Sequence, residues 1–176
     1  VARGFPIEPT AGRTNLTGEG LQHADGHSPL MAATNPAVVS YDPAYAFEIG
    51  HIMEAGLERM YGETPENVMY YITVYNEPQA QPAQPENVDR EGILRGMHLI
   101  AAGDATGLPD GAPGVQLLGS GVGVPWVLEA QDLLRKDWGG LADVWPVTSW
   151  RELRRRGISC DGRALPPTGA ERVGPL

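Results

Sequence analysis

A glycine-rich block near the start of the chain holds the densest set of side chains able to do chemistry. Glu19, His23, Asp25 and His27 lie within nine residues, and the glycines among them let the backbone approach a ligand closely. Histidine titrates near neutral pH, and a neighbouring carboxylate can fix its tautomer. The block therefore predicts acid and base chemistry, with a turn-rich surface loop as the alternative interpretation.

Other motifs carry weaker signals. The His-Ala-Asp-Gly-His spacing of residues 23–27 follows none of the usual zinc patterns, so we predict no metal site on this chain. Residues 119–123 (Gly-Ser-Gly-Val-Gly) lack the spacing of the third glycine in a dinucleotide fingerprint and the lysine of a nucleotide-triphosphate loop, and close packing of a helix on a strand explains them better. Cys160 has no histidine near it in sequence, which disfavours a nucleophilic role. His51 and His98 fall in helical patterns and are predicted to be structural.

The first half of the chain must position this block. Residues 1–36 show no sustained period and are predicted to be one long ordered loop region. An apolar strand over 37–41 is followed by Asp42 and Pro43, which predict the N-cap and first residue of a helix that ends at Gly62. Residues 67–75 are β-branched and aromatic, as in a buried parallel strand. Because ligands bind at the carboxyl edge of such sheets, the proline-rich loop over 76–89 leaves the edge of interest.

A second strand, helix and strand pattern follows. Glycine, proline and aspartate dominate residues 101–114, the composition of a linker between domains. Beyond them we predict a strand over 115–118, a helix over 124–138 and a strand over 142–147. Ser149 to Glu152 then form a capping box for a further helix.

Composition excludes several classes of protein. The chain has 176 residues, a net charge of −9 and one lysine, so it lacks the basic surface that nucleic acid requires. No run approaches the length of a membrane span, and the arginines of residues 151–156 are too few for a membrane anchor, so neither partner is predicted. A single cysteine makes a reducing compartment, the cytoplasm, the expected location.

Seven short blocks of the sequence resemble a known family. They lie between residues 11 and 155 and closely resemble the homodimeric bacterial pyruvate dehydrogenase first component, a thiamine diphosphate enzyme of the transketolase-like superfamily. The Gly-Glu-Gly-Leu-Gln-His-x-Asp-Gly-His-Ser string is the most specific of them, and Val74 to Pro78 look most like the actinobacterial branch. The blocks are residues 11–14, 18–28, 40–45, 56–63, 66–68, 71–73 and 147–149.

The resemblance implies an α/β fold in two parts. Residues 1–100 would be the later part of a pyrimidine-binding domain, 101–114 a linker, and 115–176 the start of a transketolase C-terminal-like domain. It also implies that His23 and Glu19 are catalytic, facing the substrate on the thiazolium side of the cofactor. Asp25 and His27 match the same motif and would be supporting residues.

The same resemblance implies a partner. The family's Gly-Asp-Gly motif for diphosphate and Mg²⁺, and the glutamate that activates the aminopyrimidine, have no counterpart here. We therefore expect a larger chain to bind thiamine diphosphate and Mg²⁺, in a hetero-oligomer such as a heterotetramer. Together the chains would decarboxylate pyruvate or a related 2-oxo acid and pass two carbons to a lipoyl-bearing acyltransferase.

Three alternatives stay open at this point. The acceptor can instead be a small molecule such as the ketone of a sugar, as in split biosynthetic enzymes. The chain can be a non-catalytic structural subunit that kept the fold. It can also be a trimmed piece of a longer enzyme, since it begins without methionine.

Overall fold

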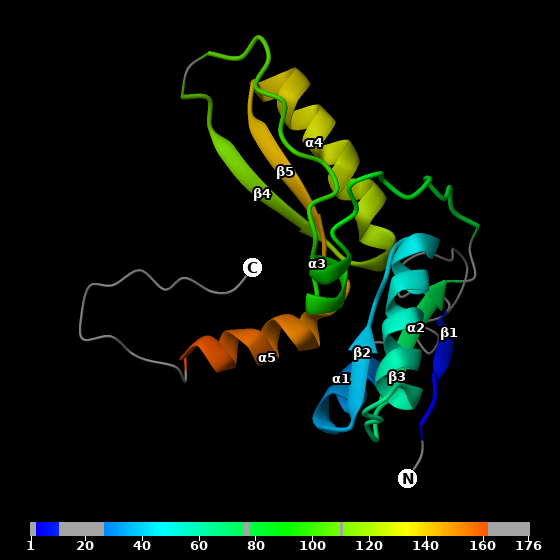
Figure 1. Ribbon diagram of the computed structural model, residues 1–176. Coiled ribbons are helices and arrows are strands. Elements are labelled where there is room, and N and C mark those ends of the chain that lie inside the picture. Colours follow the sequence, from blue (N-terminus) through cyan, green and yellow to red (C-terminus); the bar gives the residue numbers. More distant parts are fainter. Residues whose placement is uncertain (1–2, 11–26, 76–77, 110, 162–176) are drawn as a thin grey trace.

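The computed structural model describes residues 3–10, 27–75, 78–109 and 111–161. These ranges form two parallel sheets with their helices, one above the other in Figure 1, which confirms the predicted α/β class. Within the same ranges, no helix has the length and apolar character that crossing a bilayer requires.

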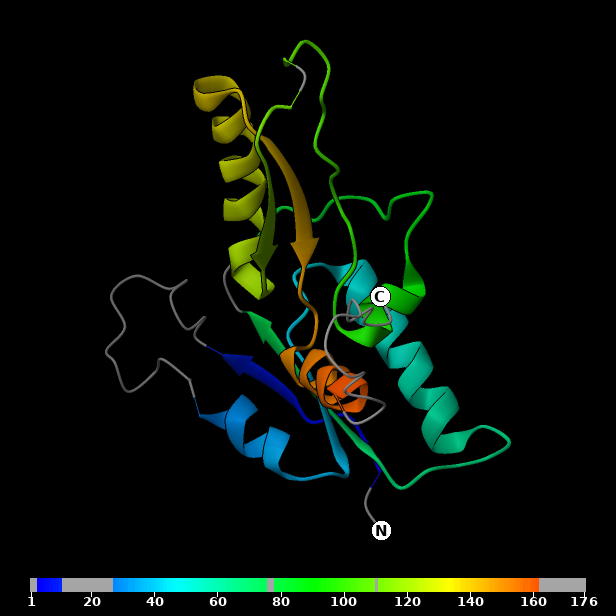
Figure 2. The ribbon, with the colours of Figure 1, turned by 90° about the vertical axis from the view of Figure 1, so that its left-hand side faces the viewer.

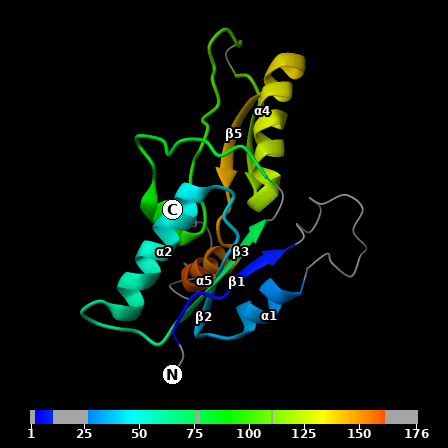
Figure 3. The same cartoon turned by 90° about the vertical axis from the view of Figure 1, so that its right-hand side faces the viewer.

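The first sheet has three parallel strands in the order β1 (Ile7–Thr10), β3 (Met69–Tyr75) and β2 (Val38–Tyr41). The chain runs from one edge strand to the other through α1 (Ser28–Thr34) and returns to the centre through α2 (Ala46–Tyr61). Right-handed crossovers that run in opposite directions place their helices on opposite faces of a sheet. Figures 2 and 3 show the sheet between α1 and α2 in this way.

The prediction of one long loop over residues 1–36 is wrong where this region is described, because it contains β1 and α1. β1 has only four residues, and its pairing with β3, not an apolar alternation, defines it. None of the residues of α1 is buried, so no apolar period marks that helix in the sequence.

α2 confirms the predicted helix but begins later than expected. Its first residue is Ala46, and the Glu48 carboxylate accepts hydrogen bonds from the backbone N–H groups of Ala44 (2.7 Å) and Tyr45 (3.0 Å). Glu48 thus satisfies amides at the start of the helix that have no partner within it. The prediction of Asp42 as the N-cap is wrong. Its carboxylate accepts hydrogen bonds from the hydroxyls of Thr73, Tyr75 and Ser120.

The core lies between α2, the first sheet and α3 (Arg90–Arg95). α3 was not predicted. It has only six residues, and Ile93 is its one buried residue other than glycine, so no helical period of apolar residues marks it in the sequence. Asp89 caps it by accepting the Gly92 N–H at 2.8 Å, and Gly96 ends it in the left-handed conformation. Among the described residues, the buried side chains that pack together in this core are those of Val39, Tyr41, Ile52, Met60, Val68, Tyr70, Ile72 and Ile93.

The second sheet pairs β4 (Gly114–Gly119) with β5 (Leu141–Pro146) in parallel. A short 3-10 turn, η2 (Gly121–Gly123), and α4 (Val124–Trp138) connect them. A Cβ added at Gly119 would lie 2.8 Å from the Val127 side chain, so close packing of helix on strand explains this glycine, as predicted. The predicted strands and helix are confirmed within one residue at most ends.

The other edge of β5 is covered by the chain that follows α3. Met97 and Ala101 make antiparallel bridges to Val147 and Val144, and Ile100 donates its N–H to Val144 at 3.0 Å. The chain leading into residues 101–114 therefore belongs to the second sheet by its hydrogen bonds. The division of the chain at 101–114 stays a prediction.

α5 (Trp150–Asp161) closes the described part of the chain. Half of the predicted capping box is confirmed, because the Ser149 hydroxyl accepts the Glu152 N–H at 3.1 Å. The Glu152 carboxylate instead accepts hydrogen bonds from Arg151 (2.9 Å) and Arg155 (2.9 Å). Part of the basic cluster is thus neutralised within its own helix.

Candidate functional site

Three of the four predicted site residues, Glu19, His23 and Asp25, lie outside the described residues. The fourth, His27, is exposed and immediately precedes α1. Of the four, the described part of the chain therefore includes His27 alone, and their roles stay predictions. What the structure does define is where the chain enters and leaves residues 11–26, after β1 and before α1.

Both ends of the connection that carries the block are fixed beside β1. Thr10, the last residue of β1, pairs in register with Tyr75 at the end of β3. At the other end, the Ser28 hydroxyl donates a hydrogen bond to Glu8 Oε1 at 3.4 Å. The chain thus enters residues 11–26 at the carboxyl end of β1, the edge where parallel sheets bind ligands, and Ser28, at the start of α1, bonds the same strand.

Asp42 is the central polar residue at this edge. It follows the last residue of β2, and its Oδ1 accepts hydrogen bonds from the hydroxyls of Thr73 (2.5 Å) and Tyr75 on β3. Its Oδ2 accepts one from the Ser120 hydroxyl at 2.8 Å. A carboxylate that accepts three hydroxyls is engaged as a structural acceptor, which explains why Asp42 does not cap α2.

Backbone hydrogen bonds join the two sheets at the same place. Asp42 donates its N–H to Thr148 at 2.7 Å, and its carbonyl accepts the Gly121 N–H at 3.2 Å. The Ser149 hydroxyl donates to the Ser40 carbonyl at 2.6 Å. The end of β5 and the turn after β4 are therefore both bonded to the end of β2.

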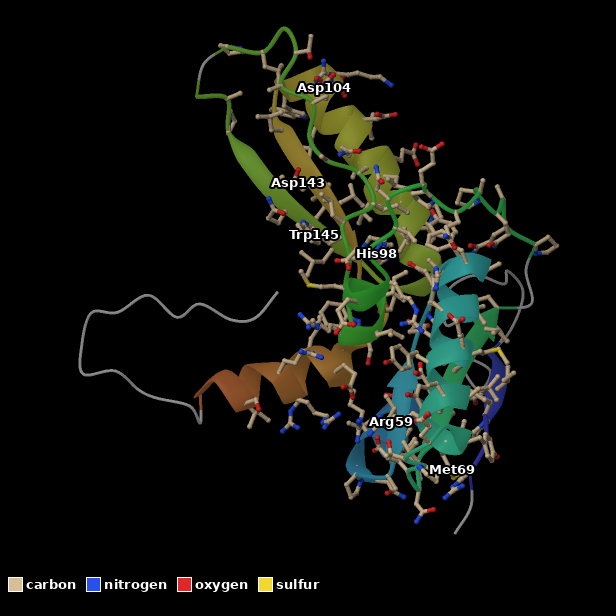
Figure 4. The ribbon with its side chains drawn as sticks, viewed as in Figure 1. Arg59, Met69, His98, Asp104, Asp143 and Trp145 are labelled. Atoms are coloured by element: carbon tan, nitrogen blue, oxygen red, sulfur yellow. The ribbon has the colours of Figure 1, made fainter. Side chains whose placement is uncertain are left out.

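A second junction is buried. Glu48 Oε1 on α2 and His98 Nε2 lie 2.7 Å apart, with side chains 0% and 2% exposed. Figure 4 places His98 where the upper and lower parts of the molecule meet. The predicted structural role of His98 is confirmed, although this residue follows α3 and lies outside any helix.

The period of the apolar residues in α2 predicts Glu48 on the solvent side of the helix, and this prediction is wrong because Glu48 is buried. The buried positions of the helix are Glu48, Ile52, Gly56 and Met60, spaced four residues apart. This spacing could have indicated that Glu48 lies on the buried face. A glutamate is nevertheless expected to be exposed unless its buried partner is known, and that partner, His98, lies fifty residues away in sequence.

A cavity of about 270 Å³ lies on the face of the first sheet that α1 and α5 flank. Its lining is mostly apolar, yet Asp42 and Thr73 belong to it, so the cavity reaches the polar edge. Tyr41 also lines it, and burial, followed by the neighbouring Tyr70, holds the pKa of Tyr41 well above its ordinary range. The cavity offers an apolar wall with a polar end, and the charged groups of its described lining are Asp42, Arg151 and Arg154.

A larger groove, of about 740 Å³, lies between the chain over residues 78–82 and the start of α4. Tyr45 and Trp126 form aromatic walls of it. Burial, and then the charge of Glu48, raise the pKa of Tyr45, which therefore stays protonated and able to donate a hydrogen bond. Among the described residues, no three metal-ligating side chains gather to hold an ion.

Comparison with known families divides the chain in two. Residues 1–82 match the family described as pyruvate dehydrogenase E1 component middle domain. Residues 96–174 match the family described as transketolase-like TK C-terminal domain.

Curated relatives cover nearly all of this chain. The pyruvate dehydrogenase E1 component of Mycolicibacterium smegmatis is 57% identical over 165 residues, 94% of this chain and 17% of the relative. That of Escherichia coli K12 is 52% identical over 161 residues, 91% of this chain and 17% of the relative. The chain thus spans about a sixth of the length of these relatives.

Solved structures agree on the fold. Transketolase from Campylobacter jejuni superposes with a TM-score of 0.62 at 17% identity, over 87% of this chain and 21% of that one. The H261F mutant of Pichia stipitis transketolase gives 0.59 at 15% identity, over 87% and 20%. At this identity the likeness shows a shared fold alone.

Proposed function

Because the chain belongs to the pyruvate dehydrogenase E1 component family, we propose that it contributes proton-transfer residues to a thiamine diphosphate-dependent 2-oxo acid decarboxylase. Pyruvate is the proposed substrate. His23 and Glu19 are the proposed catalytic residues, and Asp25 and His27 support them.

One observation carries this proposal. The connection over residues 11–26 leaves β1 beside Tyr75 and returns at Ser28, which bonds Glu8 on the same strand. The chain therefore enters a block rich in histidine and carboxylate from the carboxyl edge of a parallel sheet. Side chains held there can deliver and accept protons at a bound substrate, as general acid and base catalysis requires.

The residues of this chain fit the reacting end of the cofactor better than its diphosphate end. When bound, thiamine diphosphate supplies the carbanion chemistry that releases carbon dioxide from a 2-oxo acid. His23 would hold or move a proton at its imidazole, and Glu19 would orient that imidazole. Asp42, the carboxylate at this edge, already accepts three hydroxyls, and the described residues offer no metal cluster. We therefore assign the diphosphate and Mg²⁺ to a larger partner chain.

The partners follow from this assignment. We propose a cytoplasmic hetero-oligomer, such as a heterotetramer, in which the larger chain carries the diphosphate-binding domain. A lipoyl-bearing acyltransferase is the proposed acceptor, because the chain is 46–57% identical to components of pyruvate dehydrogenase.

The substitution His23→Ala tests the chemistry. Made in the native gene, so that the chain keeps its natural partner or extension, it should lower the turnover of pyruvate about 10²-fold or more while assembly is unchanged. His51→Ala, which removes a histidine from α2, is the matched control and should keep its turnover. An unchanged rate for His23→Ala contradicts the proposal.

Native mass spectrometry of the protein isolated from its source tests the partner. We expect a longer chain and the mass of thiamine diphosphate with Mg²⁺ in the same ion. A particle that holds only this chain, without cofactor, contradicts the assignment of the diphosphate to a second chain.

A further inference from the structure

We propose that Asp42 is a positioning residue that latches the second sheet onto the carboxyl edge of the first. The latch consists of Asp42 and the three hydroxyl groups that its carboxylate accepts, those of Thr73, Tyr75 and Ser120. Its effect on catalysis rests on the proposed function; the latch itself does not.

The three hydroxyls come from both halves of the molecule. Thr73 and Tyr75 are alternate residues of the central strand β3, so both point to the same face of the sheet. Ser120 belongs to the turn that follows β4 of the second sheet, and its single hydroxyl proton is shared between Asp42 Oδ2 and the Val147 carbonyl, 2.9 Å away. One carboxylate therefore joins the middle of the first sheet to the connection between β4 and α4.

Backbone bonds on both sides of Asp42 depend on its position. Its carbonyl accepts the Gly121 N–H and its own N–H donates to the Thr148 carbonyl, so one residue contacts the chain just beyond the carboxyl ends of both β4 and β5. Gly121 has φ +49°, and a Cβ there would overlap the Tyr75 hydroxyl. The turn thus packs against Tyr75 so closely that only glycine fits at position 121.

The latch lies beside the candidate site. Tyr75, which donates to Asp42, is also the register partner of Thr10, where the chain enters residues 11–26. The latch therefore sets how far the turn over residues 119–123 lies from the end of β1, where the chain enters residues 11–26. We expect loss of the latch to alter the orientation of groups at this edge without removing any reacting group.

Hydrogen exchange followed by mass spectrometry tests the latch directly. In the full native protein, Asp42→Ala should speed exchange in residues 119–123 and 147–149 at least tenfold, while α4 keeps its rates. Asp42→Asn keeps an oxygen for Thr73 and Tyr75, and its amide can donate to Ser120, so it should stay within about threefold of the wild type. Unchanged rates in Asp42→Ala, or equal rates in the two variants, overturn the proposal.

A second pair of variants keeps the test decisive if Asp42→Ala does not fold. Gly121→Ala forces a side chain against Tyr75, whereas Gly123→Ala, two residues later, meets no atom within 4 Å. We expect faster exchange at 147–149 in Gly121→Ala and wild-type rates in Gly123→Ala. Wild-type rates in both variants overturn the latch.

Turnover separates the two proposals. With the latch weakened, kcat for pyruvate should fall about tenfold or more in Asp42→Ala and recover in Asp42→Asn, because geometry is restored without the charge. Failure of this pattern, with exchange as expected, removes the catalytic consequence and leaves the latch. If His23→Ala also leaves turnover unchanged, the proposed function fails instead.

Discussion

Glu48 and His98 are hydrogen-bonded at 2.7 Å in a place sealed from solvent, although fifty residues separate them in sequence. The carboxylate also accepts the N–H groups of Ala44 and Tyr45, so one side chain closes the start of α2 and ties it to the chain after α3. Removal of either partner leaves buried polar groups without acceptors or donors, which is costly.

We therefore expect Glu48→Ala to lower the free energy of unfolding by about 3 kcal/mol or more. Urea denaturation followed by circular dichroism measures this change. Glu58→Ala removes an exposed glutamate from the same helix and should change the free energy by less than about 0.5 kcal/mol. Equal losses in the two variants would argue against a special role of the buried pair.

Two glycines of α2 should respond oppositely to alanine. A Cβ at Gly56 would lie 2.7 Å from the Phe5 ring and 3.3 Å from the Tyr70 ring. A Cβ at Gly50 would have no other atom within 4 Å. Gly50→Ala should raise the free energy of unfolding by about 0.5–1 kcal/mol, because alanine has the higher helix propensity, and the midpoint of thermal unfolding should rise with it. Gly56→Ala should lower stability by about 1–3 kcal/mol through overpacking.

A double variant identifies the cause. Phe5→Leu should recover part of the loss in Gly56→Ala, because the ring that blocks the new methyl group is gone. If Gly56→Ala is as stable as Gly50→Ala, the close approach of Phe5 to α2 is wrong.

Stability should fall at alkaline pH partly because of Tyr41. Burial, and then Tyr70, raise the pKa of Tyr41 far above its ordinary value of about 10. The unfolded chain loses this proton as the pH passes about 10 while the folded chain keeps it, so the contribution is complete below that pH and is lost above it.

Tyr41→Phe cannot ionise and should flatten the fall in the urea midpoint between about pH 9 and 11. At pH 7 it should cost about 1 kcal/mol, because the hydrogen bond to the Leu94 carbonyl is lost. Tyr61→Phe, whose ring is exposed, is the control variant. A slope identical to that of the wild type in Tyr41→Phe contradicts the prediction.

Ser149 should matter more than its size indicates. Its hydroxyl accepts the Glu152 N–H and donates to the Ser40 carbonyl, so it caps α5 and joins that helix to β2. Ser149→Ala should lower the free energy of unfolding by about 1–2 kcal/mol in denaturant titrations. Ser159→Ala, at an exposed position of the same helix, should have little effect; comparable losses would refute the capping role.

Elements with a strong local signal could be predicted from the sequence. The β-branched run over 67–75 and the α4 pattern over 124–138 were placed within two residues of their observed bounds, because both segments are long enough for apolar residues to recur along them. β1, α1 and α3 were missed, because they are short and bury few side chains. Pairing with β3, a tertiary effect, defines β1.

The residue types of the candidate site could be predicted from the sequence, but the contacts around Asp42 could not. The glycine-rich block stands out through residue types alone, and its resemblance to a family supplied the roles of His23 and Glu19. Asp42 was interpreted as a local cap, since Asp-Pro before a helix usually is one. Its real partners, Thr73, Tyr75 and Ser120, are 31 to 78 residues away, a distance that local patterns cannot bridge.

The central position of β3 has a consequence during synthesis. β1 and β2 both pair with β3, which is the last of the three strands to be made. A nascent chain must therefore carry two unpaired strands, together with the block between them, until residue 75 leaves the ribosome. A chaperone that binds exposed strands has its window of action on this protein before that moment.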